Sequence, residues 1–138
     1  MNDIFKDSLR KVKPIRLREP LAQTLGALGE NMGDVLEYGF IDVVKMAGHA
    51  CPTVAGAWLC CQLALEKLYE NAIPVRGQIS VTVYGEADDG VYGVMAQVYS
   101  YLTGAAPATG FKGLGHKFRR KDLLKFSPRI IDQEALCF

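Results

Sequence analysis

A histidine and a cysteine stand two positions apart, at His49 and Cys51, just before a stretch with helical periodicity. Pro52 follows the cysteine. Proline suits the first turn of a helix because the backbone N–H that it lacks would have no partner there. Cys51 is therefore expected at or beside the N-cap of that helix. Unpaired N–H groups and the helix dipole favour the thiolate form of a cysteine in this position.

Three interpretations of this pair follow from its chemistry. A thiolate beside an imidazole can supply two ligands of a transition metal ion, or a nucleophile and its base. Both residues are therefore candidate metal ligands and candidate catalytic groups. The alternative is that Cys51 is a small buried side chain and His49 a loop residue bonded to backbone. Small residues at 55–57, which let another molecule approach, favour a functional site.

The segment Gly48-His-Ala-Cys-Pro-Thr-Val-Ala-Gly56 resembles the Gly-His-x-Cys-Pro-Gly-x-x-x-Gly signature of the formylmethanofuran dehydrogenase E-type family. It is more similar still to the bacterial branch with Cys-Pro-Thr-Val-Ala-Gly. Weaker similarity covers most of the chain, in the segments Glu19–Gly26, Asp42–Lys45, Pro74–Gly77, Thr103–Ala105 and Gly110–Gly113, and extends to about Phe126. The resemblance implies an α+β core, often dimeric, with a metal-binding His/Cys site. It does not imply methanogenesis.

The chain departs from the family pattern in three places. Thr53 stands where members often have glycine, and Asp88-Asp89-Gly90 stands where many have a cysteine before the second helix. No paired cysteines follow Phe126, where some members carry a zinc finger. The resemblance therefore carries the metal-binding role to His49 and Cys51 alone.

A glycine-rich basic segment holds the other candidate site residues. His116 is the only histidine besides His49 and is the natural third metal ligand, although an exposed histidine without a ligand is the alternative. Lys112, Gly113 and Gly115 are candidate cofactor-binding residues, since glycine lets the backbone approach a ligand closely.

The basic residues from Lys112 to Lys125 form a cluster with three possible roles. They can bind an anionic ligand, pair with the acidic residues at 86–89, or face solvent. Glu86 is a weak candidate for a hard-metal ligand or general base.

The composition predicts a single folded domain spanning residues 1–138, because 49% of the residues are hydrophobic and only 22% are charged. The net charge of +1 gives no case for nucleic acid or an anionic membrane as a partner. No apolar run reaches the length of a membrane span and no signal segment begins the chain, so we expect a cytoplasmic protein. Cys60 and Cys61, adjacent in the sequence, are expected to be reduced core or interface residues.

The apolar pattern predicts two principal helices. One covers residues 53–69, and the other begins near Gly90 with Asp89 as its cap and ends at Gly104. Residues 20–29 form a shorter helix that starts at Pro20. The buried stripe of the first helix is expected to comprise Val54, Trp58, Cys61, Leu65 and Leu68.

Strands are expected at Gln78–Tyr84, from strict alternation, and at Val35–Phe40. Asp42–Met46 is expected to be a helical turn, in which Asp42 either orients His49 or pairs with Lys45. Residues 1–13 form a short helix or a loose arm, and residues 127–138 a tail that adds a strand or packs on a partner subunit.

These features predict an α+β domain in which two principal helices pack on a small, mainly antiparallel sheet. We expect a homodimer with the His49/Cys51 site near its interface. The favoured function is transition-metal binding, with zinc as the first candidate and iron or haem iron as the others. A metal-free thiol enzyme or redox sensor is the second candidate, and an anion-binding module is the third. Because His49 and Cys51 are suited both to metal binding and to catalysis, the sequence does not decide whether the protein is an enzyme.

Overall fold

The computed structural model describes residues 3–29, 33–127 and 136–137. In these residues the chain forms five helices and five strands, which confirms the α+β class. The elements are, in order, α1 (Asp3–Arg10), β1 (Ile15–Arg18), α2 (Pro20–Thr24), β2 (Val35–Tyr38), α3 (Phe40–Ala47), α4 (Pro52–Tyr69), β3 (Val81–Tyr84), α5 (Tyr92–Thr103), β4 (Leu124–Ser127) and β5 (Leu136–Cys137). None of the described helices is both long and apolar enough to cross a membrane.

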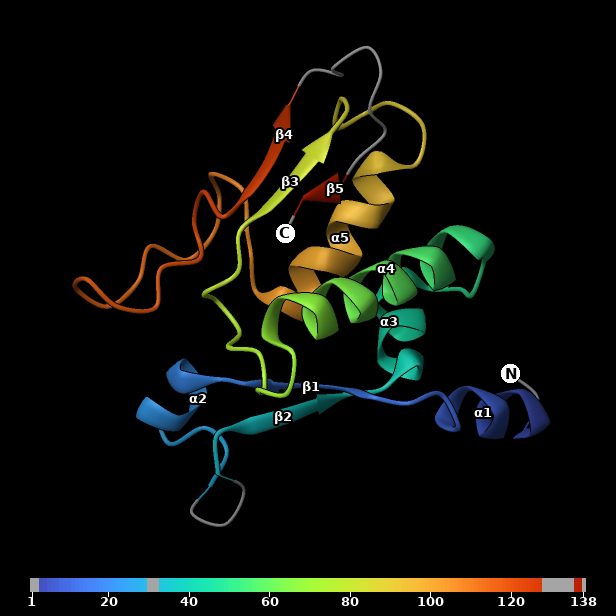
Figure 1. Ribbon diagram of the computed structural model, residues 1–138, viewed down its shortest axis with the longest axis horizontal. Coiled ribbons are helices and arrows are strands. Elements are labelled where there is room, and N and C mark those ends of the chain that lie inside the picture. The colour runs from blue at the N-terminus through green and yellow to red at the C-terminus, as the bar shows by residue number, and fades with distance from the viewer. Residues whose placement is uncertain (1–2, 30–32, 128–135, 138) are drawn as a thin grey trace.

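The described strands form two small sheets rather than one (Figure 1). β1 and β2 pair antiparallel, with Ile15 opposite Tyr38. In the second sheet the central strand β3 is parallel to β4 and antiparallel to β5. The parallel pairing needs a long connection, which α5 and the segment 104–123 supply between β3 and β4.

The core lies where α4 and α5 pack against each other and against α3 and β3. Trp58 of α4 and Tyr99 of α5 are its largest fully buried side chains. The predicted stripe of α4 is buried from Val54 to Leu65, but Leu68 in the last turn is 52% exposed. The two principal helices are therefore the two that the periodicity predicts.

Several element boundaries differ from the predictions. The strand expected at 35–40 ends at Tyr38, because Gly39 is the N-cap of α3 and its N–H donates to Asp42 Oδ2 at 2.9 Å. The strand expected at 78–84 begins only at Val81, although Ile79 is buried.

Two predicted helix limits are wrong. Asp89 does not cap α5, whose N-cap is Val91 without a side-chain hydrogen bond. Instead, Asp89 donates its backbone N–H to the Glu86 carbonyl at 3.2 Å, in a turn that precedes the helix. The helix expected at 20–29 ends at Thr24, because Gly26 adopts a φ of +66° that a right-handed helix excludes.

Among the described residues, a helix lies near the start of the chain and a short strand near its end. Residues Asp3–Arg10 form α1, which packs on α3 and buries Leu9, so they are a helix and not a loose arm. The tail adds β5 to β3, as one of its two predicted roles requires. Residues 128–135 and 138, including the apolar positions Ile130, Ile131 and Phe138, lie outside the described part.

Candidate functional site

The turn between α3 and α4 brings His49 and Cys51 into contact. Gly48 ends α3 with a φ of +80°, the left-handed conformation that favours glycine. Nδ1 of the His49 ring lies 3.1 Å from the carbonyl oxygen of Ala47. Because a carbonyl oxygen only accepts, Nδ1 carries the proton. The neutral ring then keeps its lone pair on Nε2, the form that binds a metal or accepts a proton.

Cys51 is the N-cap residue of α4, and Pro52 occupies the first turn as the sequence predicts. The Cys51 carbonyl accepts the Ala55 N–H at 3.0 Å, which starts the helical hydrogen bonding. The N–H groups of Thr53 and Val54 face the sulfur, although neither contact has the geometry of a regular capping hydrogen bond. Cys51 is half-buried and His49 exposed, so both are accessible from solvent.

The ends of two helices shift the two pKa values in opposite directions. The Val54 N–H lowers the pKa of Cys51 most, partial burial opposes it, and contact with His49 lowers it further. The Ala47 carbonyl raises the pKa of His49 most, and contact with the Cys51 sulfur adds to this. A helix C-terminus favours a cation and a helix N-terminus an anion. The turn therefore stabilises a thiolate beside an imidazolium.

Asp42 takes the second of its two expected roles. Its Oδ2 accepts the Gly39 N–H at the start of α3, and its Oδ1 lies 3.8 Å from Lys45 Nζ. The Asp42 carboxylate thus makes its contacts in the first half of α3, whereas His49 lies beyond the other end of this helix. The Ala47 carbonyl, and not a carboxylate, orients the His49 ring.

The His49–Cys51 pair supplies only two metal ligands. In the part of the chain that the structure describes, no three His, Cys, Asp or Glu side chains gather closely enough to hold a metal ion. The segment that contains His116 forms the orange loop at the left of Figure 1, whereas the α3–α4 turn lies at the right. The structure therefore does not bring His116 to His49 and Cys51 within one chain.

The loop that holds His116 is a hairpin whose shape explains its glycines. Leu114 and Lys117 exchange backbone hydrogen bonds of 2.9 and 3.1 Å, which leaves Gly115 and His116 as the two turn residues. Gly115 has a φ of +62°, as the first position of such a turn favours. Gly113 packs against the Lys117 carbonyl, where a Cβ would clash. Turn geometry alone accounts for Gly113 and Gly115, and Lys112 beside them is exposed.

The two adjacent cysteines of α4 differ from Cys51. Cys61 is buried, and burial raises the pKa of its thiol to about 12. Cys60 is half-buried and contacts the Tyr99 hydroxyl. Both are free thiols, as expected. Cys51 and Cys60 are nine positions apart along α4, roughly 13 Å along the axis, so they cannot form a disulfide with each other.

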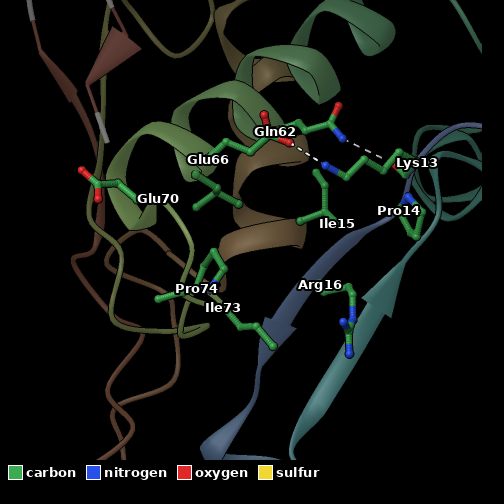
Figure 2. Close-up of a pocket in the computed structure, with 11 residues that line it drawn as sticks. Lys13, Pro14, Ile15, Arg16, Gln62, Glu66, Glu70, Ile73 and Pro74 are labelled. Carbon is green, nitrogen blue, oxygen red and sulfur yellow. Dashed lines mark hydrogen bonds and ion pairs between the residues drawn. The ribbon is translucent and has the colours of Figure 1, made fainter.

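A small groove lies away from the His49–Cys51 turn, between the start of β1 and the second half of α4 (Figure 2). Its volume is about 170 Å³, and its walls include Ile15, Leu65 and Pro74. The ion pair between Lys13 Nζ and Glu66 Oε1, 3.1 Å long, joins its two sides. The groove contains no cysteine or histidine, and it brings no group of the candidate site together.

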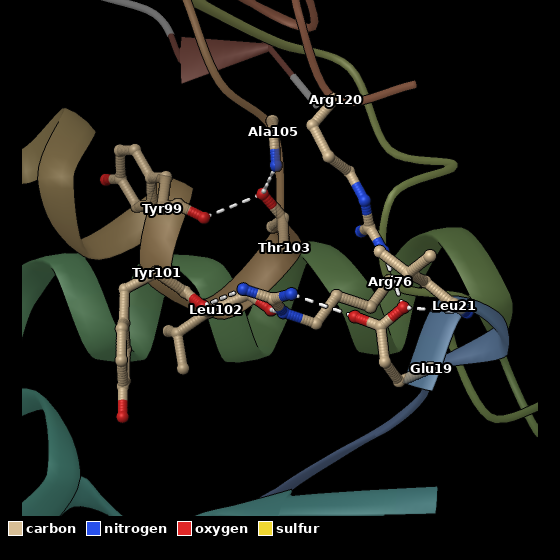
Figure 3. A network of polar contacts seen from close by, with 9 residues as sticks. All are labelled: Glu19, Leu21, Arg76, Tyr99, Tyr101, Leu102, Thr103, Ala105 and Arg120. Carbon is tan, nitrogen blue, oxygen red and sulfur yellow. Dashed lines mark hydrogen bonds and ion pairs between the residues drawn. The ribbon is translucent and has the colours of Figure 1, made fainter. Parts of the chain in front are cut away.

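A buried carboxylate held by two arginines is the feature that the sequence did not reveal (Figure 3). Glu19 is only 4% exposed. Arg120 Nη2 donates to its Oε1 at 2.5 Å, and Arg76 Nη1 donates to its Oε2 at 2.8 Å. Arg76 also donates to the carbonyls of Tyr101 and Leu102 at 2.8 and 3.1 Å, and so caps the last turn of α5.

This network corrects the interpretation of the basic cluster. Arg120 is 7% exposed, and Glu19 neutralises it, so it is not available to an external anion. Its guanidinium packs on Gly77 and Gly104, where a Cβ at either glycine would overlap it. Because the partner carboxylate is 101 residues away in the sequence, no local pattern could have predicted the pair.

Comparisons with known proteins do not identify the chain. No protein-family model matches it, and neither curated proteins nor solved structures give a significant match. The resemblance to the formylmethanofuran dehydrogenase E-type family therefore stays a prediction that rests on the His49–Cys51 segment.

Proposed function

We propose that His49 and Cys51 bind a transition metal ion, with zinc as the first candidate and iron or haem iron as the others. The observation that carries the proposal is the opposed pair of helix ends, which favours a thiolate beside a ring with Nδ1 bonded to Ala47. A metal-bound histidine commonly donates its other ring N–H to a carbonyl or carboxylate. The two side chains thus fit such an ion as two of its ligands.

Two protein ligands leave coordination positions open, unlike a closed structural zinc site with four. A bound zinc ion would supply a Lewis acid at these positions. Solvent, a small-molecule ligand or a residue of a second copy of the chain would complete the coordination. The expected homodimer is part of the proposal for this reason. The exposure of His49 and Gly56 around the start of α4 supports access for any of the three.

Elemental analysis and absorption spectra of untagged protein test metal binding. We expect near-stoichiometric zinc, iron or haem in the wild type and its loss in His49→Ala and in Cys51→Ala. Cys60→Ala is the matched control, since it removes a neighbouring thiol of the same helix without touching the turn. Metal and haem contents that are unchanged in both site variants would exclude the site.

A metal-free function for the same pair is the second candidate. The lowered pKa of Cys51 and the raised pKa of His49 both favour a thiolate–imidazolium pair, which is the starting state of a cysteine nucleophile or a redox sensor. If metal blocks alkylation of Cys51, the first candidate is favoured. Rapid alkylation in protein purified without metal, and unaffected by added zinc, favours the second.

A further inference from the structure

The first of two complementary surfaces is the basic hairpin, residues 111–121. This segment contains five Lys or Arg residues and no Asp or Glu. Arg120 is buried at its base, whereas Lys112, Lys117 and Arg119 are exposed. Phe111 and Leu114 are exposed beside them. The hairpin therefore presents apolar side chains within a positively charged surface.

The second surface is the acidic shoulder, residues 86–94, which joins β3 to the start of α5. Its three carboxylates, at Glu86, Asp88 and Asp89, are all exposed. Val91 and Val94 are large apolar side chains that are exposed next to them. The shoulder thus combines apolar character with negative charge, which is the counterpart of the basic hairpin.

Among the residues that the structure describes, no ion pair joins the basic hairpin to the acidic shoulder. Pairing with the acidic residues at 86–89, one of the three possible roles of the basic cluster, does not occur among the described residues. Arg119 pairs with Asp122 at 2.5 Å, but Lys112 and Lys117 make no ion pair within the described ranges. Within the same ranges, the three carboxylates of the shoulder make none either.

Both surfaces are held in shape by close packing. In the shoulder, a Cβ at Gly93 would meet the Ala87 carbonyl and one at Gly85 would meet the Tyr92 ring. The hairpin is closed by the Leu114–Lys117 hydrogen bonds and anchored through Arg120 to Glu19. Surfaces that are ordered beforehand lose less conformational entropy on association.

We propose that the basic hairpin of one copy of this chain docks on the acidic shoulder of a second copy. Two-fold symmetry makes the contact twice, because each copy carries both surfaces. Phe111 and Leu114 then cover Val91 and Val94, and the lysines face the carboxylates. The contact does not depend on metal binding at His49 and Cys51.

A second copy is a better fit than the other occupants of a basic surface. A net charge of +1 gives little long-range attraction for nucleic acid or an anionic membrane. Leu59 and Leu63 of α4 are exposed and would be the alternative contact between copies. That face is apolar only, whereas the hairpin and shoulder match in charge as well.

Charge reversal tests the contact, with mass measured by light scattering over a concentration series. We expect the wild type to be a dimer that weakens with added salt. The hairpin variant Lys112→Glu/Lys117→Glu and the shoulder variant Asp88→Lys/Asp89→Lys should each dimerise at least about tenfold more weakly. An equimolar mixture of the two should form heterodimers, since each then offers the charge that the other needs. Lys6→Glu/Lys11→Glu is the control for net charge alone.

Circular dichroism of each variant verifies folding before its mass is interpreted. A wild type that is monomeric at tens of micromolar overturns the proposal, as does a dimer that both reversals leave intact. A dimer lost only in Leu59→Ser/Leu63→Ser assigns the contact to α4 instead. Failure of the mixture to associate, with both variants folded, also counts against the hairpin–shoulder contact.

Discussion

At the scale of single residues, backbone groups at two helix ends are the largest single causes of the pKa shifts of Cys51 and His49, ahead of any one contact between the two side chains. A cysteine at the start of one helix meets a histidine at the end of another, and each charge is favoured by the backbone groups nearest to it. Gly48 makes this arrangement possible, since its left-handed conformation turns the chain between the two helices. The α3–α4 turn therefore determines both the proximity of the two side chains and the direction of their pKa shifts.

The pH dependence of Cys51 alkylation follows from these shifts. The thiolate forms as pH rises through the lowered pKa of Cys51, and the imidazolium is lost as pH rises through the raised pKa of His49. We expect alkylation of Cys51 in metal-free protein to persist to lower pH than for an ordinary exposed thiol. His49→Ala should move the midpoint upward, because it removes a contact that lowers the pKa of Cys51.

The measurement is the iodoacetamide rate against pH, with the modified cysteine identified by mass spectrometry. Cys60→Ala provides a background in which a neighbouring thiol cannot contribute. If Cys51 reacts at pH 7 no faster than an ordinary exposed thiol, the thiolate state is absent.

A pair of glycine substitutions separates the turn from the helix. Gly48→Ala should destabilise the fold by about 1–2 kcal/mol, because alanine is strained at a φ of +80°. Gly56→Ala should instead stabilise it by about 0.5–1 kcal/mol, since Gly56 is helical, in the second turn of α4, and nothing lies within 4 Å of the new Cβ. Urea unfolding measures both. Equal effects of the two substitutions would contradict the conformation assigned to Gly48.

At the scale of elements, local patterns predicted what local physics determines. Pro52 and the spacing of Val54, Trp58 and Cys61 predicted α4 almost to the residue. The prediction that Asp89 caps α5 was wrong. Asp89 has a residue type that suits an N-cap, but the sequence does not show that a turn separates it from the start of the helix. The arrangement of His49 and Cys51 was predictable, since two positions and one helix start define it.

Long-range pairings were not predictable in the same way. The division into two sheets, the parallel β3–β4 pair and the position of His116 all depend on how distant segments meet. The clearest case is Glu19, which joins β1 to the base of the basic hairpin and to the end of α5. Nothing in the local sequence distinguishes its two partners, Arg76 and Arg120, from arginines at the surface.

Substitution of Arg120 tests this connection. Arg120→Ala should destabilise the fold by about 3–5 kcal/mol, because it leaves the buried Glu19 carboxylate with one of its two cationic partners removed. Arg119→Ala, its exposed neighbour, should change the free energy of unfolding by no more than about 0.5 kcal/mol. Urea unfolding of the two variants decides the point. Similar free energies of unfolding for the two variants would mean that the Arg120–Glu19 ion pair does not stabilise the fold.

At the scale of the whole molecule, metal binding at the turn would be coupled to folding. An ion that binds only the folded turn adds stability in proportion to the logarithm of its excess over the dissociation constant, about 2.7 kcal/mol at a hundredfold excess. For a domain of 138 residues this corresponds to a rise in Tm of roughly 8–12 °C. We expect such a rise when zinc is added to metal-free wild type.

The variants assign that stabilisation to the turn. Cys51→Ala and His49→Ala should each lose the rise in Tm, while Cys60→Ala keeps it, because only the first two remove a proposed ligand. The rise should also diminish as pH falls, since protons compete with the ion for the thiolate and the imidazole. The lowered pKa of Cys51 places the loss of the thiolate at a lower pH than for an ordinary cysteine. An equal rise in the wild type and in both site variants would locate zinc elsewhere in the molecule.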